Sequence, residues 1–390
     1  MPVRSRASRR LATFGETVFT TYTRLAERHG AVNLGQGFPD FAPPDFALSA
    51  LRDAAEGPQQ YAPLPGVPEL SAAVAEKMSA RLGRPVTAPE NVQITVGATE
   101  ALFALMQAFI DPGDEVVVLE PFYDAYPADV IMAGGVPRFV PLLPQGDDWV
   151  IDEDALRSAF TNRTKAVVVN TPHNPTGKVF SAAELDLIVA LAERYDALIV
   201  SDEVYEHLAF APFVSVASRL GAWERTVSVS SIGKTFSVTG WKVGWAVGPE
   251  DLIRPLRAAH QWIPFAVATP LQRASARLLR EAEARGYYGD LAAMFQKKRD
   301  LLLEQLAETP FRALTPQGGY FVVADGSALG YADDVALCNA LPERAGVVAI
   351  PPSAFYSDAH KHLAKKLVRF AFCKSDEAIL EAGRRLRALQ

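Results

Sequence analysis

The stretch that decides the fold is residues 226–245, Thr-Val-Ser-Val-Ser-Ser-Ile-Gly-Lys-Thr-Phe-Ser-Val-Thr-Gly-Trp-Lys-Val-Gly-Trp. Its β-branched opening, residues 226–229, predicts a buried strand, and Lys234 follows where that strand ends. Open α/β sheets bind their ligands at this end of the strands. A lysine amine that is partly removed from water loses its proton more readily and becomes a nucleophile toward carbonyl groups. Ser231 and Lys242 are candidates to hold an anion beside it.

This segment resembles the lysine segment of the class I/II aminotransferases, which are fold-type-I enzymes that use pyridoxal phosphate. The wording Gly-Lys-Thr-Phe-Ser-Val-Thr-Gly-Trp-Lys, from residue 233, is most similar to the branch that contains kynurenine aminotransferase (glutamine transaminase K) and methionine aminotransferase. The resemblance covers residues 14–385. It implies that Lys234 is the catalytic residue and holds the cofactor aldehyde, while Ser231 and Lys242 contact the cofactor phosphate.

A second anion site is indicated upstream. Residues 92–96 alternate as a strand, and Gly97 then leads into a helix that we expect to extend to about Phe109. The free N–H groups and the dipole of a helix N-terminus attract anions, although many turns of this kind bind nothing. The resemblance implies that Ala98 and Thr99 hold the cofactor phosphate here.

Two more predicted strands end in candidate site residues. Residues 114–119 are followed by an aromatic segment, and the resemblance makes Tyr123 the side chain that stacks on the cofactor ring. Residues 166–170 run into Asn-Thr-Pro-His-Asn-Pro-Thr-Gly-Lys, a rigid turn in which we expect a cis peptide bond at Asn174–Pro175. In the resembling family, the residue that matches Asn174 contacts the phenolic oxygen of the cofactor.

The apolar strand at residues 197–200 ends in Ser-Asp-Glu-Val-Tyr. A carboxylate at the end of a buried strand is costly unless a cation or hydrogen-bond donors pair with it, and the protonated ring nitrogen of pyridoxal phosphate is such a cation. Asp202 is therefore the candidate that keeps this nitrogen protonated, so that the ring can accept electrons. A helix N-cap is the structural alternative. Tyr205 is the candidate donor to the phenolic oxygen, beside Asn174.

The substrate side is read mostly from the resemblance. Gly37, in Asn-Leu-Gly-Gln-Gly-Phe-Pro-Asp, is expected near the substrate carboxylate. Arg369 lies inside an apolar strand at residues 367–372, and its guanidinium suits bidentate binding of a carboxylate, although an edge-strand arginine that faces water is the alternative. Tyr61 is expected to reach the cofactor phosphate of the other subunit of a homodimer. The uncharged candidates for the wall of the substrate pocket are Phe19, Tyr22, Trp262 and Phe265.

The 390 residues predict two domains in an α/β fold whose mostly parallel central sheet carries helices on both faces. We place the large cofactor domain at residues 41–285 and a smaller α/β domain at residues 12–40 and 286–390, after a flexible N-terminus at residues 1–11. Helical periodicity is expected over residues 11–29 and again over residues 271–306.

Composition excludes several classes of protein. A net charge of −6 gives no basic field for nucleic acid, and no apolar stretch reaches the roughly 20 residues that a membrane helix needs. Two cysteines, Cys338 and Cys373, are too few and too scattered for a disulfide framework or a metal site. We therefore expect a cytoplasmic protein with no metal and no nucleic-acid or membrane partner.

The predicted function is a ping-pong transfer of the amino group of an L-amino acid to a 2-oxo acid. Aromatic, sulfur-containing or glutamine-like donors are favoured, with kynurenine and methionine among them. A cysteine-S-conjugate β-lyase and an N-succinyldiaminopimelate-type aminotransferase share the same residues and stay open. A regulatory module that binds the cofactor without turnover is disfavoured, because only about 30 residues precede the pocket motif and no basic helix-turn-helix is present.

Overall fold

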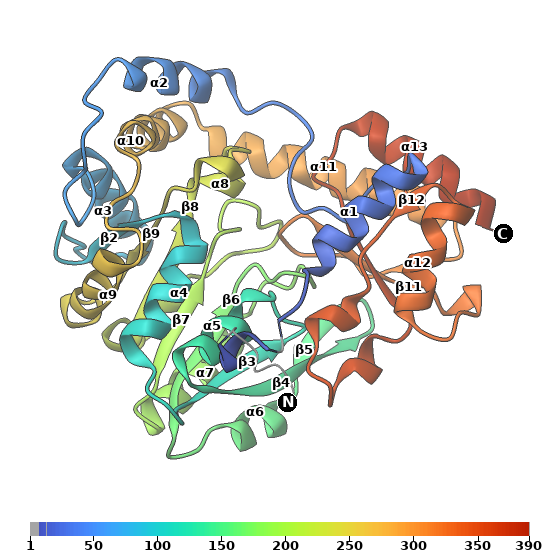
Figure 1. Ribbon diagram of the computed structural model, residues 1–390, viewed down its shortest axis with the longest axis horizontal. Coiled ribbons are helices and arrows are strands. Elements are labelled where there is room, and N and C mark those ends of the chain that lie inside the picture. The colour runs from blue at the N-terminus through green and yellow to red at the C-terminus, as the bar shows by residue number, and fades with distance from the viewer. Residues whose placement is uncertain (1–7, 13, 390) are drawn as a thin grey trace, which may run out of the picture.

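The computed structural model describes residues 8–12 and 14–389, and its centre is an eight-stranded sheet in the order β2-β9-β8-β7-β6-β3-β4-β5 (Figure 1). Strands β3, β4, β6, β7 and β8 run parallel, whereas β9 is antiparallel to both of its neighbours and β5 is antiparallel to β4. This confirms the expected, mostly parallel sheet. The strands are β2 (Val92–Thr95), β3 (Glu115–Glu120), β4 (Val136–Gln145), β5 (Asp148–Ile151), β6 (Thr164–Asn170), β7 (Leu198–Asp202), β8 (Thr226–Ser231) and β9 (Gly244–Val247).

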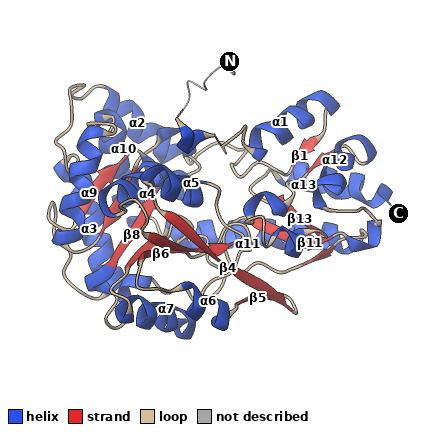
Figure 2. Ribbon diagram, turned by 60° about the horizontal axis from the view of Figure 1, so that its bottom comes forward, coloured by secondary structure: helices blue, strands red, loops and turns tan. Residues whose placement is uncertain are grey.

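Both faces of this sheet are buried under helices, as Figure 2 shows. Side chains alternate between the two faces of a strand, so Val116 and Val118 of β3 pack in one cluster and Val117 and Leu119 pack in the other. The first face is covered by α4 (Gly97–Phe109), α5 (Ala125–Ala133) and α9 (Glu250–Trp262), and the second by α6 (Glu153–Ala159) and α7 (Ala182–Arg194). Strands buried on both faces explain the continuous apolar runs in the sequence.

A further layer of helices covers the β2–β9 end of the sheet. It consists of α2 (Asp45–Ala55), α3 (Pro68–Leu82) and α10 (Thr269–Ala284), and Leu70, Val74 and Leu278 are fully buried in its core. Short helix α8 (Ile232–Thr235) follows β8 directly and is packed into the same core through Ile232. The segment that carries Lys234 is thereby held between the sheet and this layer.

Both ends of the chain build a separate core, in which α1 (blue) lies beside α13 (red) in Figure 1. Strand β1 pairs in parallel with β12, and β11 is the middle strand of the sheet β10-β11-β13. We propose on this basis that residues 12–40 and 286–390 form the small domain and residues 41–285 the large one. The elements are α1 (Val18–His29), β1 (Val32–Asn33), α11 (Tyr287–Ala307), β10 (Arg312–Ala313), β11 (Phe321–Asp325), α12 (Asp334–Arg344), β12 (Val347–Val348), β13 (Leu367–Ala371) and α13 (Asp376–Leu386).

Some element boundaries differ from the prediction. Helix α1 begins at Val18 instead of residue 11, because the Thr17 side chain caps it by accepting from the Thr20 N–H. The periodicity over residues 271–306 is divided between α10 and α11, because Gly286 adopts a left-handed conformation with φ of 66°. Of the predicted flexible end, residues 1–7 lie outside the described residues, whereas Arg9–Leu11 forms a short 3-10 helix.

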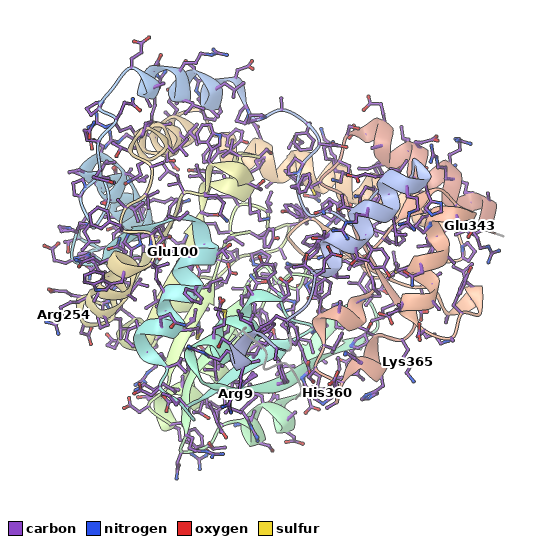
Figure 3. The ribbon with its side chains drawn as sticks, viewed as in Figure 1. Arg9, Glu100, Arg254, Glu343, His360 and Lys365 are labelled. Carbon is purple, nitrogen blue, oxygen red and sulfur yellow. The ribbon has the colours of Figure 1, made fainter. Side chains whose placement is uncertain are left out.

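Hydrogen bonds join the two cores on both sides of the sheet edge. The Gln317 N–H donates to the Gly177 carbonyl at 2.9 Å, and the Gln317 carbonyl accepts from the Phe210 N–H at 2.7 Å. On the other side, the buried Glu120 carboxylate at the end of β3 accepts from the Ser357 N–H at 2.7 Å and contacts the His360 ring, which Figure 3 labels. Between these two sets of contacts, the two cores face each other at the carboxyl ends of the central strands.

The turn at residues 171–175 lies at this junction, and its Asn174–Pro175 peptide bond is cis, as expected. Among the described residues, no helix combines the length and apolar character needed to cross a membrane.

Candidate active site

A cavity of about 240 Å³ lies at the carboxyl ends of the central strands, between the two domains. It is lined by the site residues predicted from the sequence, except for Tyr61 and for the wall candidates Tyr22, Trp262 and Phe265. The strand ends meet there because β6, β7 and β8 are parallel neighbours, with Asn170 beside Asp202 and Asp202 beside Val229. The predicted residues in its wall are Phe19, Gly37, Ala98, Thr99, Tyr123, Asn174, Asp202, Tyr205, Ser231, Lys234, Lys242 and Arg369.

Lys234 reaches this cavity from α8. Its Nζ donates to the Tyr320 hydroxyl at 2.7 Å and lies 3.5 Å from the Gly37 carbonyl oxygen. Burial disfavours the charged amine and lowers the pKa of Lys234 to about 8. A lysine with that pKa is partly neutral near physiological pH, so it can act as a nucleophile and exchange a proton.

Asp202 ends β7 at the floor of the cavity and is 4% exposed. Its carboxylate accepts from the Tyr126 hydroxyl at 2.7 Å and from the Val204 N–H at 3.2 Å. Burial raises the pKa of Asp202, although these two donors oppose the shift. Within the described residues, no lysine, arginine or histidine forms an ion pair with this carboxylate, so its charge is complementary to a cationic group placed in the cavity.

The opposite end of the cavity is built to attract an anion. Helix α4 begins at Gly97, whose φ of 70° is in the left-handed region, and its first N–H groups have no partner within the helix. Lys242 brings its Nζ to 3.4 Å from the Thr99 hydroxyl. Glu100, labelled on α4 in Figure 3, accepts from the Val96 N–H at 3.0 Å and fixes the turn that precedes the helix.

Arg369 enters the cavity from β13 of the small domain and is fully buried. Its guanidinium donates to the Asn174 side-chain oxygen at 3.2 Å and to the Gly35 carbonyl at 2.8 Å, and its Nε has no partner in the structure. Its face packs on Phe321, at 4.1 Å from the ring centroid. Burial lowers the pKa of Arg369 to about 10, so it remains charged at neutral pH and can bind a carboxylate.

The pattern of the family "Aminotransferase class I and II" matches residues 29–386. This chain belongs to that family. The kynurenine–oxoglutarate transaminase of Dictyostelium discoideum is 38% identical, with 98% of this chain and 96% of the relative covered. The methionine aminotransferase of Escherichia coli is 38% identical, with 97% of each covered. The solved structure of N-succinyldiaminopimelate aminotransferase from Mycobacterium tuberculosis is 44% identical, with a TM-score of 0.94 over 98% of this chain and 100% of that one.

These relatives confirm the expected branch and the fold-type-I architecture, and the chain is an aminotransferase. The family as a whole is known to use pyridoxal phosphate. The roles of the individual residues in the cavity stay predictions that rest on the geometry given above.

Three residues that hydrogen-bond to Asp202 or Lys234 were not predicted. Tyr126 holds Asp202, and it stands in the aromatic segment from which only Tyr123 was chosen. Asn170 donates to the Asp202 backbone carbonyl at 2.9 Å. It is the last residue of β6, and this position at a strand end could have marked it as a site residue in the sequence. Tyr320, which contacts Lys234, had no signal in the sequence, because its strand and α8 come together only in the folded chain.

Other candidates lie elsewhere in the aminotransferase. Tyr61 is 82% exposed, and its ring meets that of Phe265 edge-on at 5.2 Å. Trp262 is 84% exposed and does not line the cavity either. Tyr22 was expected in the cavity wall, and this is wrong. Its ring is buried in the small-domain core, where its hydroxyl donates to Asn339 at 2.9 Å.

Replacement of Gly244 tests whether the start of α4 binds the cofactor phosphate. A Cβ at this residue would lie 2.7 Å from the Gly97 carbonyl carbon and 2.8 Å from the Ala98 nitrogen, so Gly244→Ala must displace the start of α4. Overpacking of this kind costs about 1–3 kcal/mol, so we expect pyridoxal phosphate to bind about tenfold to a hundredfold more weakly. The control is Gly240→Ala, because nothing lies within 4 Å of the added carbon. Equal affinities of both variants, measured by absorbance titration, would show that this turn does not hold the phosphate.

Proposed function

We propose that this aminotransferase holds pyridoxal phosphate and transfers the amino group of an L-amino acid to a 2-oxo acid in a ping-pong reaction. The observation that carries the proposal is that a single cavity contains a complement for each part of the cofactor and for a substrate carboxylate. The Lys234 amine, a buried carboxylate and a helix N-terminus converge there, together with a buried arginine.

The residues present fit this cofactor. The start of α4, with Thr99, Ser231 and Lys242, supplies the donors that a phosphate needs. Asp202 supplies a buried negative charge that has no ion-pair partner in the part of the chain that the structure describes, which matches a protonated ring nitrogen. We propose that Tyr123 covers the ring and that Asn174 and Tyr205 donate to its phenolic oxygen. When bound, the cofactor supplies an aldehyde that combines with amines and a ring that accepts electrons.

Lys234 is the residue that we propose moves the proton. Its amine lies inside the cavity, beside the space that the cofactor and the substrate would share. A pKa near 8, lowered by burial, lets the amine take a proton from the substrate Cα and return it as a general acid. The rings of Tyr205 and Tyr320 beside this amine are buried, so bulk water is kept from that side of it.

Arg369 is the residue that we propose orients the substrate. Its buried guanidinium offers N–H groups to a carboxylate, and Phe19 and Phe321 pack against its faces at 5.2 and 4.1 Å. The Gly37 backbone borders the same space, and a Cβ there would lie 2.7 Å from the Phe321 ring. An amino acid held by Arg369 therefore has aromatic side chains beside it, which favours uncharged side chains over carboxylates.

We further propose a homodimer in which Tyr61 completes the cavity of the partner copy. Support comes from an exposed aromatic and aliphatic patch formed by the end of α9, the loop that follows it and the loop between α2 and α3, which a second copy would cover. It consists of Tyr61, Trp262, Ile263 and Phe265. The cytoplasmic location remains a prediction.

For the substrate, we propose aromatic, sulfur-containing or glutamine-like donors, in line with the relatives that are named for kynurenine and methionine. The alternative is an N-succinyldiaminopimelate donor, which the 44% identical structure favours. We expect kynurenine, methionine and glutamine to give higher kcat/KM than N-succinyldiaminopimelate in a panel of donors. The reverse order would replace the proposal with the alternative, and pyruvate release from cysteine conjugates would reveal β-elimination.

Lys234→Ala tests the chemistry itself. Without the amine, no group in the cavity can take the Cα proton from the same position, so we expect kcat to fall by a factor of about 10² to 10⁴ or more. The absorbance of the lysine-bound cofactor should disappear at the same time. Lys165→Ala, which removes an exposed lysine of β6, serves as the control and should keep both signals. Turnover that survives in Lys234→Ala refutes the assignment.

A further inference from the structure

Tyr320 is the buried residue nearest to the catalytic amine that the proposed roles leave unassigned. It immediately precedes β11 and is 0% exposed. Its ring is packed edge-on against Tyr205 at 5.1 Å and against Phe321 at 4.8 Å, and it faces Phe295 at 6.1 Å. The hydroxyl therefore has one accessible position, which is at the end of the Lys234 side chain.

The partners of this hydroxyl determine which hydrogen bond it donates and which it accepts. A carbonyl oxygen can only accept, so the single proton of Tyr320 is donated to the Gly37 carbonyl, at 2.5 Å. The oxygen lone pairs are then left to accept from Lys234 Nζ at 2.7 Å. The Gly37 carbonyl itself lies 3.5 Å from the same nitrogen. Tyr320 thus presents an oriented acceptor to the lysine amine.

We propose that Tyr320 is a positioning residue that holds the Lys234 amine, in its protonated form, whenever that amine is not bound to the cofactor. The inference rests on the proposed function, because it concerns the part of the reaction in which Lys234 carries a proton. The Gly37 carbonyl orients the O–H of Tyr320 away from the amine. The oxygen of that hydroxyl then keeps the amine directed into the cavity.

The sign of the effect follows from which form of the amine is stabilised. A hydrogen bond accepted from an ammonium favours the charged form, so the proposed contact with the Tyr320 oxygen opposes the lowering of the Lys234 pKa that burial causes. Other charges act on the amine independently of Tyr320. Asp202 and the Cys373 thiol raise its pKa, whereas Lys242 and Arg369 lower it.

Tyr320→Phe removes the acceptor while keeping the ring and its packing. The experiment uses the enzyme loaded with pyridoxamine phosphate, the aminated cofactor, so that the Lys234 amine is free. The rate at which acetic anhydride labels Lys234 is measured against pH by peptide mass spectrometry. We expect the midpoint of labelling in Tyr320→Phe to lie about one to two pH units below that of the wild type, the shift that corresponds to one lost hydrogen bond to a charged group.

Tyr22→Phe is the matched control. It also removes a buried tyrosine hydroxyl, which donates to Asn339 at 2.9 Å in the same domain, and it does not touch the cavity. A purely structural effect would lower stability in both variants and leave the Lys234 midpoint unchanged in both. That unchanged midpoint in Tyr320→Phe would overturn the inference.

The outcome is separable from a failure of the proposed function. If the wild type binds the cofactor and Lys234→Ala loses turnover, an unmoved midpoint refutes the role of Tyr320 alone. Should Tyr320→Phe not fold, Tyr320→Met removes the same hydroxyl and gives the same test. In a folded variant, we also expect kcat to fall more than KM changes, because the amine is less well placed for proton transfer.

Discussion

The structure of the site depends on a carboxylate that is buried at the end of a parallel strand. Moving an ion of this size out of water costs several kcal/mol, even after the surroundings relax. Tyr126 and the Val204 N–H recover part of that cost at Asp202, and Asn170 fixes the backbone from the neighbouring strand. The remainder is offset only when a cation enters the cavity. We propose that the chain maintains this unfavourable charge because it binds a cationic heterocycle.

The remaining site residues can be understood as two walls around that charge. The large domain supplies the strand ends, the start of α4 and the Lys234 segment, all fixed by one sheet. The small domain supplies Arg369, Gly37 and Tyr320. The two walls are held together by backbone contacts at Gln317 and by the Glu120 carboxylate, so the distance between the cofactor side and the substrate side is set by the docking of the two domains.

Much of this arrangement was predictable, because strand ends can be read from sequence. The parallel strands are buried on both faces, so their apolar runs stand out, and the residue after each run falls at the sheet edge. That logic selected Asp202 and Lys234, whereas Ala98 and Tyr123 came from the resemblance to the family. Tyr126 was missed because the direction in which each ring points after β3 is set by the first turn of α5 and leaves no pattern.

The small domain was harder to predict, because it is assembled from both chain ends. Helical spacing placed Tyr22 and Phe19 on the same stretch, but it could not tell which of them faces the cavity, and the hydrogen bond of Tyr22 to Asn339 in the other core decides the matter for Tyr22. Tyr320 meets Lys234 across 86 residues of sequence. Tyr61 is exposed in the single chain, and its predicted role needs a second copy.

The most direct test of the account asks whether Asp202 pairs with the ring nitrogen. The affinities of wild-type protein and Asp202→Asn are measured for pyridoxal phosphate and for its deaza analogue, in which carbon replaces that nitrogen. We predict that wild type prefers pyridoxal phosphate by about tenfold or more and that Asp202→Asn loses this preference, since close charge pairs couple by about 1.5 kcal/mol or more. An equal preference in both proteins would contradict the account.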